Sequence, residues 1–369
     1  MSRPPPSSTS EFDARVGRLL ADPLAVARQA APAGERVIGY AGAEGPVELI
    51  WAAGALPVRL RGPCEGGTAR ADEFLESAFA PELRAVAEQW LSGALDFVEA
   101  VIFPRSNDSA QRLYYYLCEL QRRGLCGGPR PLLFDVASIA RDSSYEHTLA
   151  SVRLLALSLG VAEAELAQAL QRVAVRDALL ARLVALRLES SPVLGSAAHR
   201  ALRAADCDHT EAFDRAFSSW LDQAPRLQSG CRRWLLAGSA SPDERLHRAV
   251  EAAGATIVRD LVETERASAA GSDPFETIAR RSHGARSPAQ RMLASADWLS
   301  GQARAAHADG VLLWLIEEDE ALPWEVAGQA RALETAGIPA LALTRQRWLA
   351  DPAALQAITE FVRASGGTR

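Results

Sequence analysis

The chain of 369 residues is 48% hydrophobic and 23% charged, and it carries a formal net charge of -6. This length suffices for two domains, each with its own core. The net negative charge gives no electrostatic reason to expect a nucleic acid or an anionic membrane as partner. All 40 basic residues are arginines, and the absence of lysine excludes a P-loop lysine, a Schiff-base lysine and any lysine nucleophile or base.

Cysteine use and the first residues of the chain indicate a cytoplasmic setting. No two of the five cysteines form a C-x-x-C pair or a spacing typical of zinc sites, which favours a reduced compartment. The first residues, MSRPPPSSTS, lack the apolar core of a signal peptide, and no run approaches the roughly 18 apolar residues of a membrane span. We therefore expect a soluble cytoplasmic protein without a membrane partner.

The first part of the chain predicts an α/β domain preceded by a short arm. Residues 1–34 are expected to form a tail and a helical arm, and 35–142 the first α/β domain. Apolar runs in this domain alternate with helical patterns, which is typical of parallel strands with helices on both faces. The strands are predicted at 37–41, 56–60, 100–103 and 132–136. Asp108 is expected to cap the helix after the third strand.

The rest of the chain predicts a helical segment and a second α/β domain. Helical periodicity dominates 143–229, which is therefore expected to be a helical connector. The second α/β domain is predicted at 230–369, with strands at 234–237, 255–258, 311–316 and 340–343. The predicted fold class is thus α/β, with two Rossmann-like or flavodoxin-like lobes of parallel strands joined by a helical segment. We expect a site in the cleft between the lobes, at the carboxyl ends of the strands.

The most informative stretch is VIGYAGAEGPVELIWAAGALPVRLRG at 37–62, which predicts a strand, a glycine-rich loop, a short helix and a second strand. Its glycines are not spaced as G-x-G-x-x-G. The stretch resembles a phrase of the 2-hydroxyacyl-CoA dehydratase and benzoyl-CoA reductase subunit family, G-Y-x-C-S-Y-V-P-E-E-L-I-x-A-A-G-x-L-P-V-R-L. The matching residues are Pro46, Glu48, Leu49, Ile50, Ala52, Ala53, Gly54, Leu56, Pro57, Val58, Arg59 and Leu60.

The resemblance continues in order along the chain. Residues 96–117 are similar to the family's D-F-x-D-G-V-V segment with its C-D-S, and 254–266 to its D-D-L-C-T-G-S-R phrase. Residues 308–343 are similar to its D-G-V-I strand followed by E-x-x-G-I-P-x-L. This resemblance, over about 35 to 345, implies the two-lobed fold and a subunit of either a dehydratase-type lyase or an acyl-CoA reductase.

The family's cluster ligands are absent from the matching positions. Members hold a [4Fe-4S] cluster with three cysteines, and by the resemblance these positions fall on Ala80, Asn107 and Asp319. Thiolates hold iron-sulfur clusters, so we expect this chain to bind no cofactor and the cluster to occur only in a partner subunit. Cys64, in the loop before Ala80, could swing near these positions.

Four residues are candidates for the site. The resemblance places Glu48 near the substrate, where burial could raise its pKa and make it an acid or base. The alternative for Glu48 is a first-turn glutamate favoured by the helix dipole. Arg59 and Arg266 match family positions and could bind phosphates or a carboxylate, or could instead form internal salt bridges. Asn107, just after a strand, is a further substrate-binding candidate.

Other polar groups have less specific patterns. The acidic run at 317–320 could hold a hard cation such as Mg²⁺, or could be a solvated loop. Cys207 and His209 bracket a C-D-H sequence that is expected to be a surface turn, because no further metal ligand follows at a useful spacing. The six histidines show no triad or H-E-x-x-H spacing and are assigned no chemistry.

Three functional hypotheses follow from these patterns. The first is a cluster-deficient member of the resembled family that assists acyl-CoA binding beside a homologous, cluster-bearing subunit. This subunit would form a homo- or heterodimer and depend on an ATP-driven activator. The second hypothesis is a non-catalytic binding or scaffold protein that keeps the two-lobed fold. The third is an enzyme that performs cluster-free chemistry in the same cleft.

Overall fold

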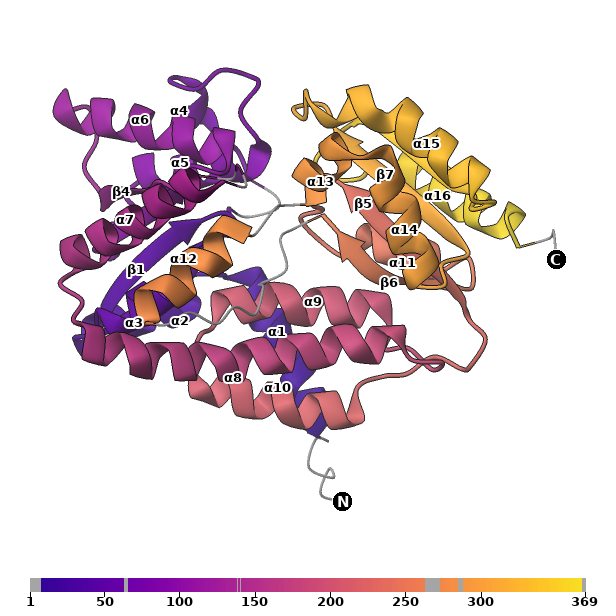
Figure 1. Ribbon diagram of the computed structural model, residues 1–369, viewed down its shortest axis with the longest axis horizontal. Coiled ribbons are helices and arrows are strands. Elements are labelled where there is room, and N and C mark those ends of the chain that lie inside the picture. The colour runs from indigo at the N-terminus through magenta and orange to yellow at the C-terminus, as the bar shows by residue number, and fades with distance from the viewer. Residues whose placement is uncertain are drawn as a thin grey trace.

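The protein contains two α/β lobes and a group of helices below them. The computed structural model describes residues 8–62, 66–137, 139, 141–262, 273–284 and 288–366. In Figure 1 most of the left lobe is indigo to magenta and comes from the first part of the chain, whereas the right lobe is orange to yellow and comes from the last part. The helices beneath come mainly from the middle of the sequence.

The first lobe contains a four-stranded parallel sheet in the order β2-β1-β3-β4. Its strands are β1 (Arg36–Ala41), β2 (Ala55–Leu60), β3 (Ala100–Pro104) and β4 (Arg130–Phe134). Successive residues of a strand point to opposite faces, so Val37 and Ile38 belong to different cores. The Val37 face is covered by α2 (Ala25–Ala30), η1 (Ala31–Ala33), α4 (Ala69–Asp72), α5 (Pro81–Leu91) and α6 (Asp108–Arg122). The Ile38 face is covered by α3 (Val47–Ala52) and α7 (Asp142–Leu159).

The second lobe repeats this arrangement, with strand order β6-β5-β7-β8 and all pairs parallel. Its strands are β5 (Arg232–Gly238), β6 (Ala255–Leu261), β7 (Gly310–Ile316) and β8 (Ala340–Gln346). One face packs on α11 (Arg245–Glu251) and α16 (Pro352–Ala364). The other packs on α13 (Pro288–Ala294), α14 (Ala296–Ala305), η2 (Leu322–Glu325) and α15 (Val326–Thr335). Both strand orders match the first four strands of a flavodoxin-like sheet. The predicted α/β fold class with parallel sheets is confirmed.

The helical group has its own core. It consists of α1 (Ser8–Ala21), α8 (Glu163–Leu188), α9 (Gly195–Cys207) and α10 (Glu211–Gln223). Phe12 of α1 packs against Phe217 and Trp220 of α10, with ring centroids 5.7 and 5.2 Å away. The expected N-terminal arm is therefore part of this core, because Phe12 packs against two aromatic rings of α10.

One helix from the late part of the chain returns to the first lobe. In Figure 1, α12 (Pro274–Gly284), drawn in orange, lies over the indigo and magenta elements near β1 and α7. Its Ile278 and Ala279 are buried in the same core as Ile38. The chain therefore crosses between the lobes three times, and α12 connects elements that are far apart in the sequence.

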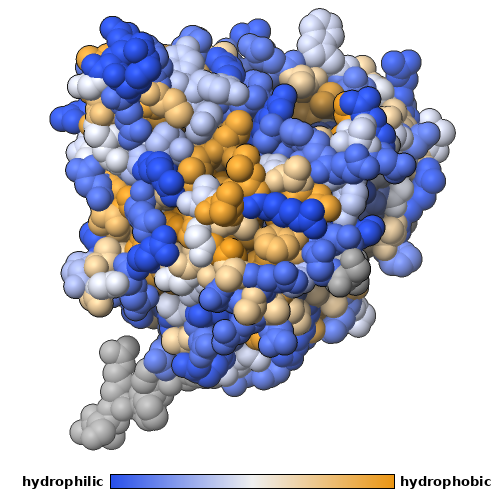
Figure 2. Space-filling model, turned by 60° about the vertical axis from the view of Figure 1, so that its left-hand side comes forward, coloured by the Kyte–Doolittle hydropathy of each residue, from blue (hydrophilic) through white to orange (hydrophobic). Residues whose placement is uncertain are grey.

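The surface of the first lobe carries apolar side chains. Figure 2 shows them gathered in the middle of the face that turns forward when the left side of Figure 1 is rotated toward the viewer. Among the large exposed apolar residues, Leu154 and Leu157 of α7 are 69% and 76% exposed. Solvent contact of this extent is unusual for neighbouring leucines on one helix and leaves part of α7 apolar toward water.

Two local predictions are wrong. Asn107, not Asp108, caps α6, because the Asn107 side chain accepts a hydrogen bond from the Ala110 amide at 2.9 Å. The C-D-H sequence is not a surface turn: Cys207 and Asp208 are buried. Asp208 lies between α9 and α1, where its Oδ2 accepts a hydrogen bond from Arg15 Nε at 3.2 Å. The arginine from α1 thus makes burial of this aspartate possible.

Candidate functional site

A cavity of about 350 Å³ lies between the two lobes and the helical group. We call it the inter-lobe cavity. Its walls contain Tyr40 from β1 and Arg59 from β2 in the first lobe, together with Asp260 from β6 in the second. Helices α8 and α9 also contribute to the wall, with Arg172 and His199 among their residues. The cavity is therefore located at the carboxyl-terminal halves of strands from both sheets, in the cleft where the sequence predicts a ligand.

The inter-lobe cavity combines positive charge with apolar surface. Its lining contains seven arginines and four aspartates, an excess of three positive charges. The arginines are Arg59, Arg61, Arg172, Arg176, Arg187, Arg203 and Arg259. Apolar side chains, among them Val47, Trp51 and Val184, line the remaining wall. Such a cavity suits a ligand that has both an anionic and an apolar part.

Arg59, one of the predicted binding residues, lines this cavity within an ion-pair network. Arg59 and Arg61 point to the same face of the chain at β2, and both are almost completely buried. Arg59 Nη1 and Arg61 Nη2 donate to the same oxygen, Asp206 Oδ2 on α9, at 3.0 and 2.8 Å. Arg61 Nη1 also donates to Glu82 Oε1 of α5 at 3.2 Å. The network joins the first lobe to the helical group, and a role for Arg59 in binding stays a prediction.

Arg172 differs from the other cavity arginines in its contacts. Its guanidinium carbon lies 3.3 Å from the ring centroid of Trp51, a cation-π contact between α8 and α3. It makes no hydrogen bond or ion pair with any residue that the structure describes. Burial lowers the pKa of Arg172, although guanidinium groups stay charged at neutral pH. Its donors are therefore available to an anion in the cavity.

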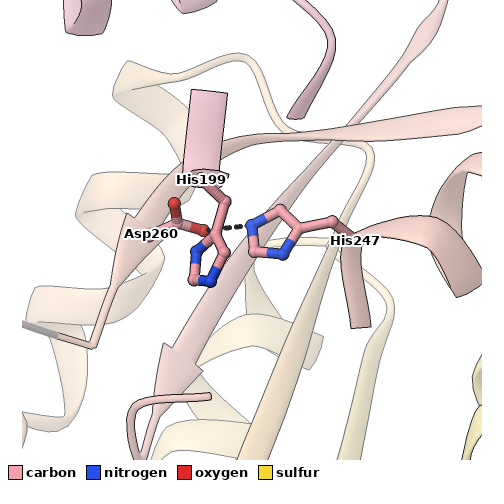
Figure 3. Close-up of side chains that lie close together, drawn as sticks. All are labelled: His199, His247 and Asp260. Atoms are coloured by element: carbon pink, nitrogen blue, oxygen red, sulfur yellow. Dashed lines mark hydrogen bonds and ion pairs between the residues drawn. The ribbon is translucent and has the colours of Figure 1, made fainter. Parts of the chain in front are cut away.

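Two residues of the wall, His199 and Asp260, form a cluster with His247, which does not line the cavity (Figure 3). Asp260 Oδ1 lies 2.9 Å from His247 Nε2, and Asp260 Oδ2 accepts from Arg187 Nη1 at 2.9 Å. The His199 ring packs on the His247 ring, with centroids 4.4 Å apart. Burial by itself raises the pKa of Asp260, but the charges of Arg187 and His247 outweigh this effect and hold that pKa well below its ordinary value. Asp260 is therefore ionised at neutral pH.

Glu48, the predicted acid or base, is buried in an ion pair. It lies in the first turn of α3 and pairs with Arg281 of α12. Arg281 Nη2 also lies 3.1 Å from Asp177 Oδ2 on α8. Asp177 lines the inter-lobe cavity, but Glu48 does not. The ion pair fixes α12 to the first lobe, and proton transfer by Glu48 stays a prediction.

The three positions that the resemblance assigns to cluster ligands carry other chemistry. Ala80 precedes α5 and offers only a methyl group. The Asn107 oxygen is used to cap α6. Asp319 accepts hydrogen bonds from Ser239 Oγ at 3.0 Å and from the Leu322 amide at 3.2 Å. This donor set does not fit a [4Fe-4S] cluster, which needs thiolates. None of the three lines the inter-lobe cavity, and Arg266 and Cys64 lie outside the described residues.

The sequence patterns indicate no chemistry at His199, His247 or Asp260. In the parts of the chain that the structure describes, they form the one group of three metal-capable side chains whose donor atoms all lie within 4.8 Å of one another. The acidic run at 317–320 forms no such group within the same parts of the chain; there Glu317 pairs with Arg345 at 3.1 Å. Because the three residues come from α9, α11 and β6, no local motif could have indicated them.

Comparison with protein families identifies the chain. The family model described as 2-hydroxyglutaryl-CoA dehydratase, D-component matches residues 43–357, which include most of both lobes and the helical group. The chain belongs to this family. The family resemblance inferred from the sequence is thereby confirmed, and this D-component family member is a dehydratase-family subunit. No curated protein matches the chain in a sequence search. None of the described helices has the length and apolarity needed to span a membrane.

Proposed function

We propose that this D-component family member is a cluster-free subunit that helps to bind an acyl-CoA beside a homologous subunit carrying the [4Fe-4S] cluster. The observation that supports this proposal best is the arginine-rich inter-lobe cavity. A CoA ester carries phosphates at one end and an apolar acyl group at the other, which correspond to the two kinds of wall in the cavity.

The proposal gives this chain the tasks of binding and orientation. Arg172 would donate to an anionic oxygen of the ligand, while Trp51 and its apolar neighbours would pack on an uncharged part. Electron delivery would belong to the partner subunit and its ATP-driven activator. The side chains at the cluster positions of this chain end in a methyl group, an amide and a carboxylate, and none of them supplies the thiolate that a cluster needs. The complete assembly would act as a 2-hydroxyacyl-CoA dehydratase or an acyl-CoA reductase.

Replacing Arg172 tests this proposal. We expect Arg172→Gln to weaken binding of butyryl-CoA about 10- to 100-fold, since one hydrogen bond to a charged group is worth about 1.5–3 kcal/mol. Isothermal titration calorimetry on the anaerobically purified chain measures this change. The matched control is Arg182→Gln on the same helix, because Arg182 pairs with Asp222 at 2.6 Å and does not line the cavity.

The same titration separates the alternatives. Binding of CoA and butyryl-CoA that Arg182→Gln leaves intact and Arg172→Gln weakens supports the acyl-CoA role. Absence of binding by the wild-type chain, or equal binding by Arg172→Gln, would contradict the role and favour a scaffold protein. An enzyme with cluster-free chemistry is the second candidate, and it is favoured by His199 and Asp260, which both line the cavity.

A further inference from the structure

The histidine and aspartate cluster at the cavity wall has the composition of a transition-metal site. Two imidazoles and one carboxylate suit borderline ions such as Zn²⁺ and Co²⁺, whereas Mg²⁺ and Ca²⁺ prefer an environment made of oxygens alone. One donor atom from each of His199, His247 and Asp260 lies within 4.8 Å of the others. Three separate elements hold these side chains, and His247 is completely buried, so the cluster is built into the core of the protein.

The two ring nitrogens of His247 differ in their hydrogen bonding. Nε2 forms a hydrogen bond with Asp260 Oδ1, at 2.9 Å. Nδ1 has no hydrogen-bond partner among the residues that the structure describes. A buried polar atom of this kind calls for a bound ion or water. A metal-binding histidine characteristically donates its other N–H to a carboxylate, which is the arrangement of His247 and Asp260.

Arg187 holds the Asp260 carboxylate in place, and His199 connects the cluster with the inter-lobe cavity. Arg187 donates to Asp260 Oδ2 and to the Ile257 carbonyl, both at 2.9 Å, and thereby holds the aspartate in place. His199 packs beside His247 and lines the inter-lobe cavity, whereas His247 lies behind it. Coordination positions of a bound ion that no protein side chain occupies would therefore face the cavity, where a ligand could fill them.

We propose that His199 and His247 bind one divalent transition-metal ion through their imidazoles at the wall of the inter-lobe cavity, with Asp260 orienting His247. The Arg187 charge already balances that of Asp260, so the ion adds net positive charge to the site. This favours moderate affinity and an anionic oxygen, such as a carboxylate, as the ligand that completes its coordination. The site is separate from the family's cluster positions and does not depend on acyl-CoA binding.

Metal titration in the absence of any CoA ester tests this proposal. The chain is first dialysed against a chelator and then titrated with Zn²⁺ by calorimetry and with Co²⁺ by visible absorption. We expect one ion per chain, d–d absorption typical of nitrogen ligands and a higher Tm on addition of Zn²⁺. His199→Ala and His247→Ala should each abolish these signals, whereas Asp260→Asn should weaken binding about 10- to 100-fold, as is usual for an outer carboxylate.

A control and a second readout keep the test decisive. His147→Ala removes a half-exposed histidine outside the cluster and should bind metal like the wild type. The Co²⁺ spectrum of the wild-type chain requires no variant, so misfolding of His247→Ala does not affect it. No stoichiometric binding by the wild type, or binding that survives in both His199→Ala and a folded His247→Ala, would overturn the proposal.

Discussion

Replacing Asp260 with alanine should lower the free energy of unfolding by about 3–5 kcal/mol, the usual cost of removing one partner from a buried ion pair. The change leaves the Arg187 guanidinium and the His247 Nε2–H buried without the carboxylate that now lies 2.9 Å from each. Urea unfolding at pH 7 measures the effect. A chelator in the buffer ensures that any metal bound at the cluster does not contribute.

An exposed aspartate provides the matched control for this prediction. Asp222 pairs with Arg182 at 2.6 Å, but both side chains are largely exposed, at 61% and 42%. Because water screens such pairs, Asp222→Ala should cost at most about 1 kcal/mol. Equal losses in the two variants would show that the Arg187–Asp260–His247 group does not hold the second lobe to the helical group.

The second large effect is expected at Glu48. Glu48→Ala should destabilise the protein by about 3 kcal/mol, near the lower end for a broken buried pair, since Arg281 keeps Asp177 as a partner 3.1 Å away. The loss removes the contact that ties α12 to α3. Chemical unfolding of the single variants Glu48→Ala and Arg281→Met and of the double variant gives their coupling energy.

The double variant decides whether the pair is structural. If Glu48 mainly neutralises Arg281, the double variant should recover at least about half of the stability that Glu48→Ala loses, as when apolar residues replace buried ion pairs. Glu48→Ala without measurable loss of stability would contradict the structural role. It would also leave proton transfer as the better explanation for a buried carboxylate at this position.

The strands could be predicted because their signal is local. Val37–Ala41 and Val311–Ile316 are short apolar runs beside helical patterns, and the structure places β1 and β7 there. Arg59 was a candidate because it matches a family position, and the structure places it near the end of β2, in the lining of the inter-lobe cavity. Boundaries were less certain: the cap of α6 differs by one residue, because Asn107 and Asp108 are both good capping residues and only the backbone geometry distinguishes them.

The site itself depends on contacts that no local pattern encodes. His199, His247 and Asp260 come together only because α9 packs between the two lobes, against β6 and α11. Burial of Asp208 likewise requires Arg15 from the N-terminal helix. Arg281 reaches Glu48 only because α12 crosses back to the first lobe. In each case the partner is distant in the sequence, so the residues alone gave no indication of the charge that stabilises them.

Acid-labile sulfide in the anaerobically purified chain tests the central proposal, a family subunit without its own cluster, most directly. Sulfide distinguishes a cluster from a metal ion bound at His199 and His247, because only the cluster contains it. The proposal predicts no sulfide above background in a chain that still binds butyryl-CoA. About four sulfides per chain, the content of one [4Fe-4S] cluster, would contradict it.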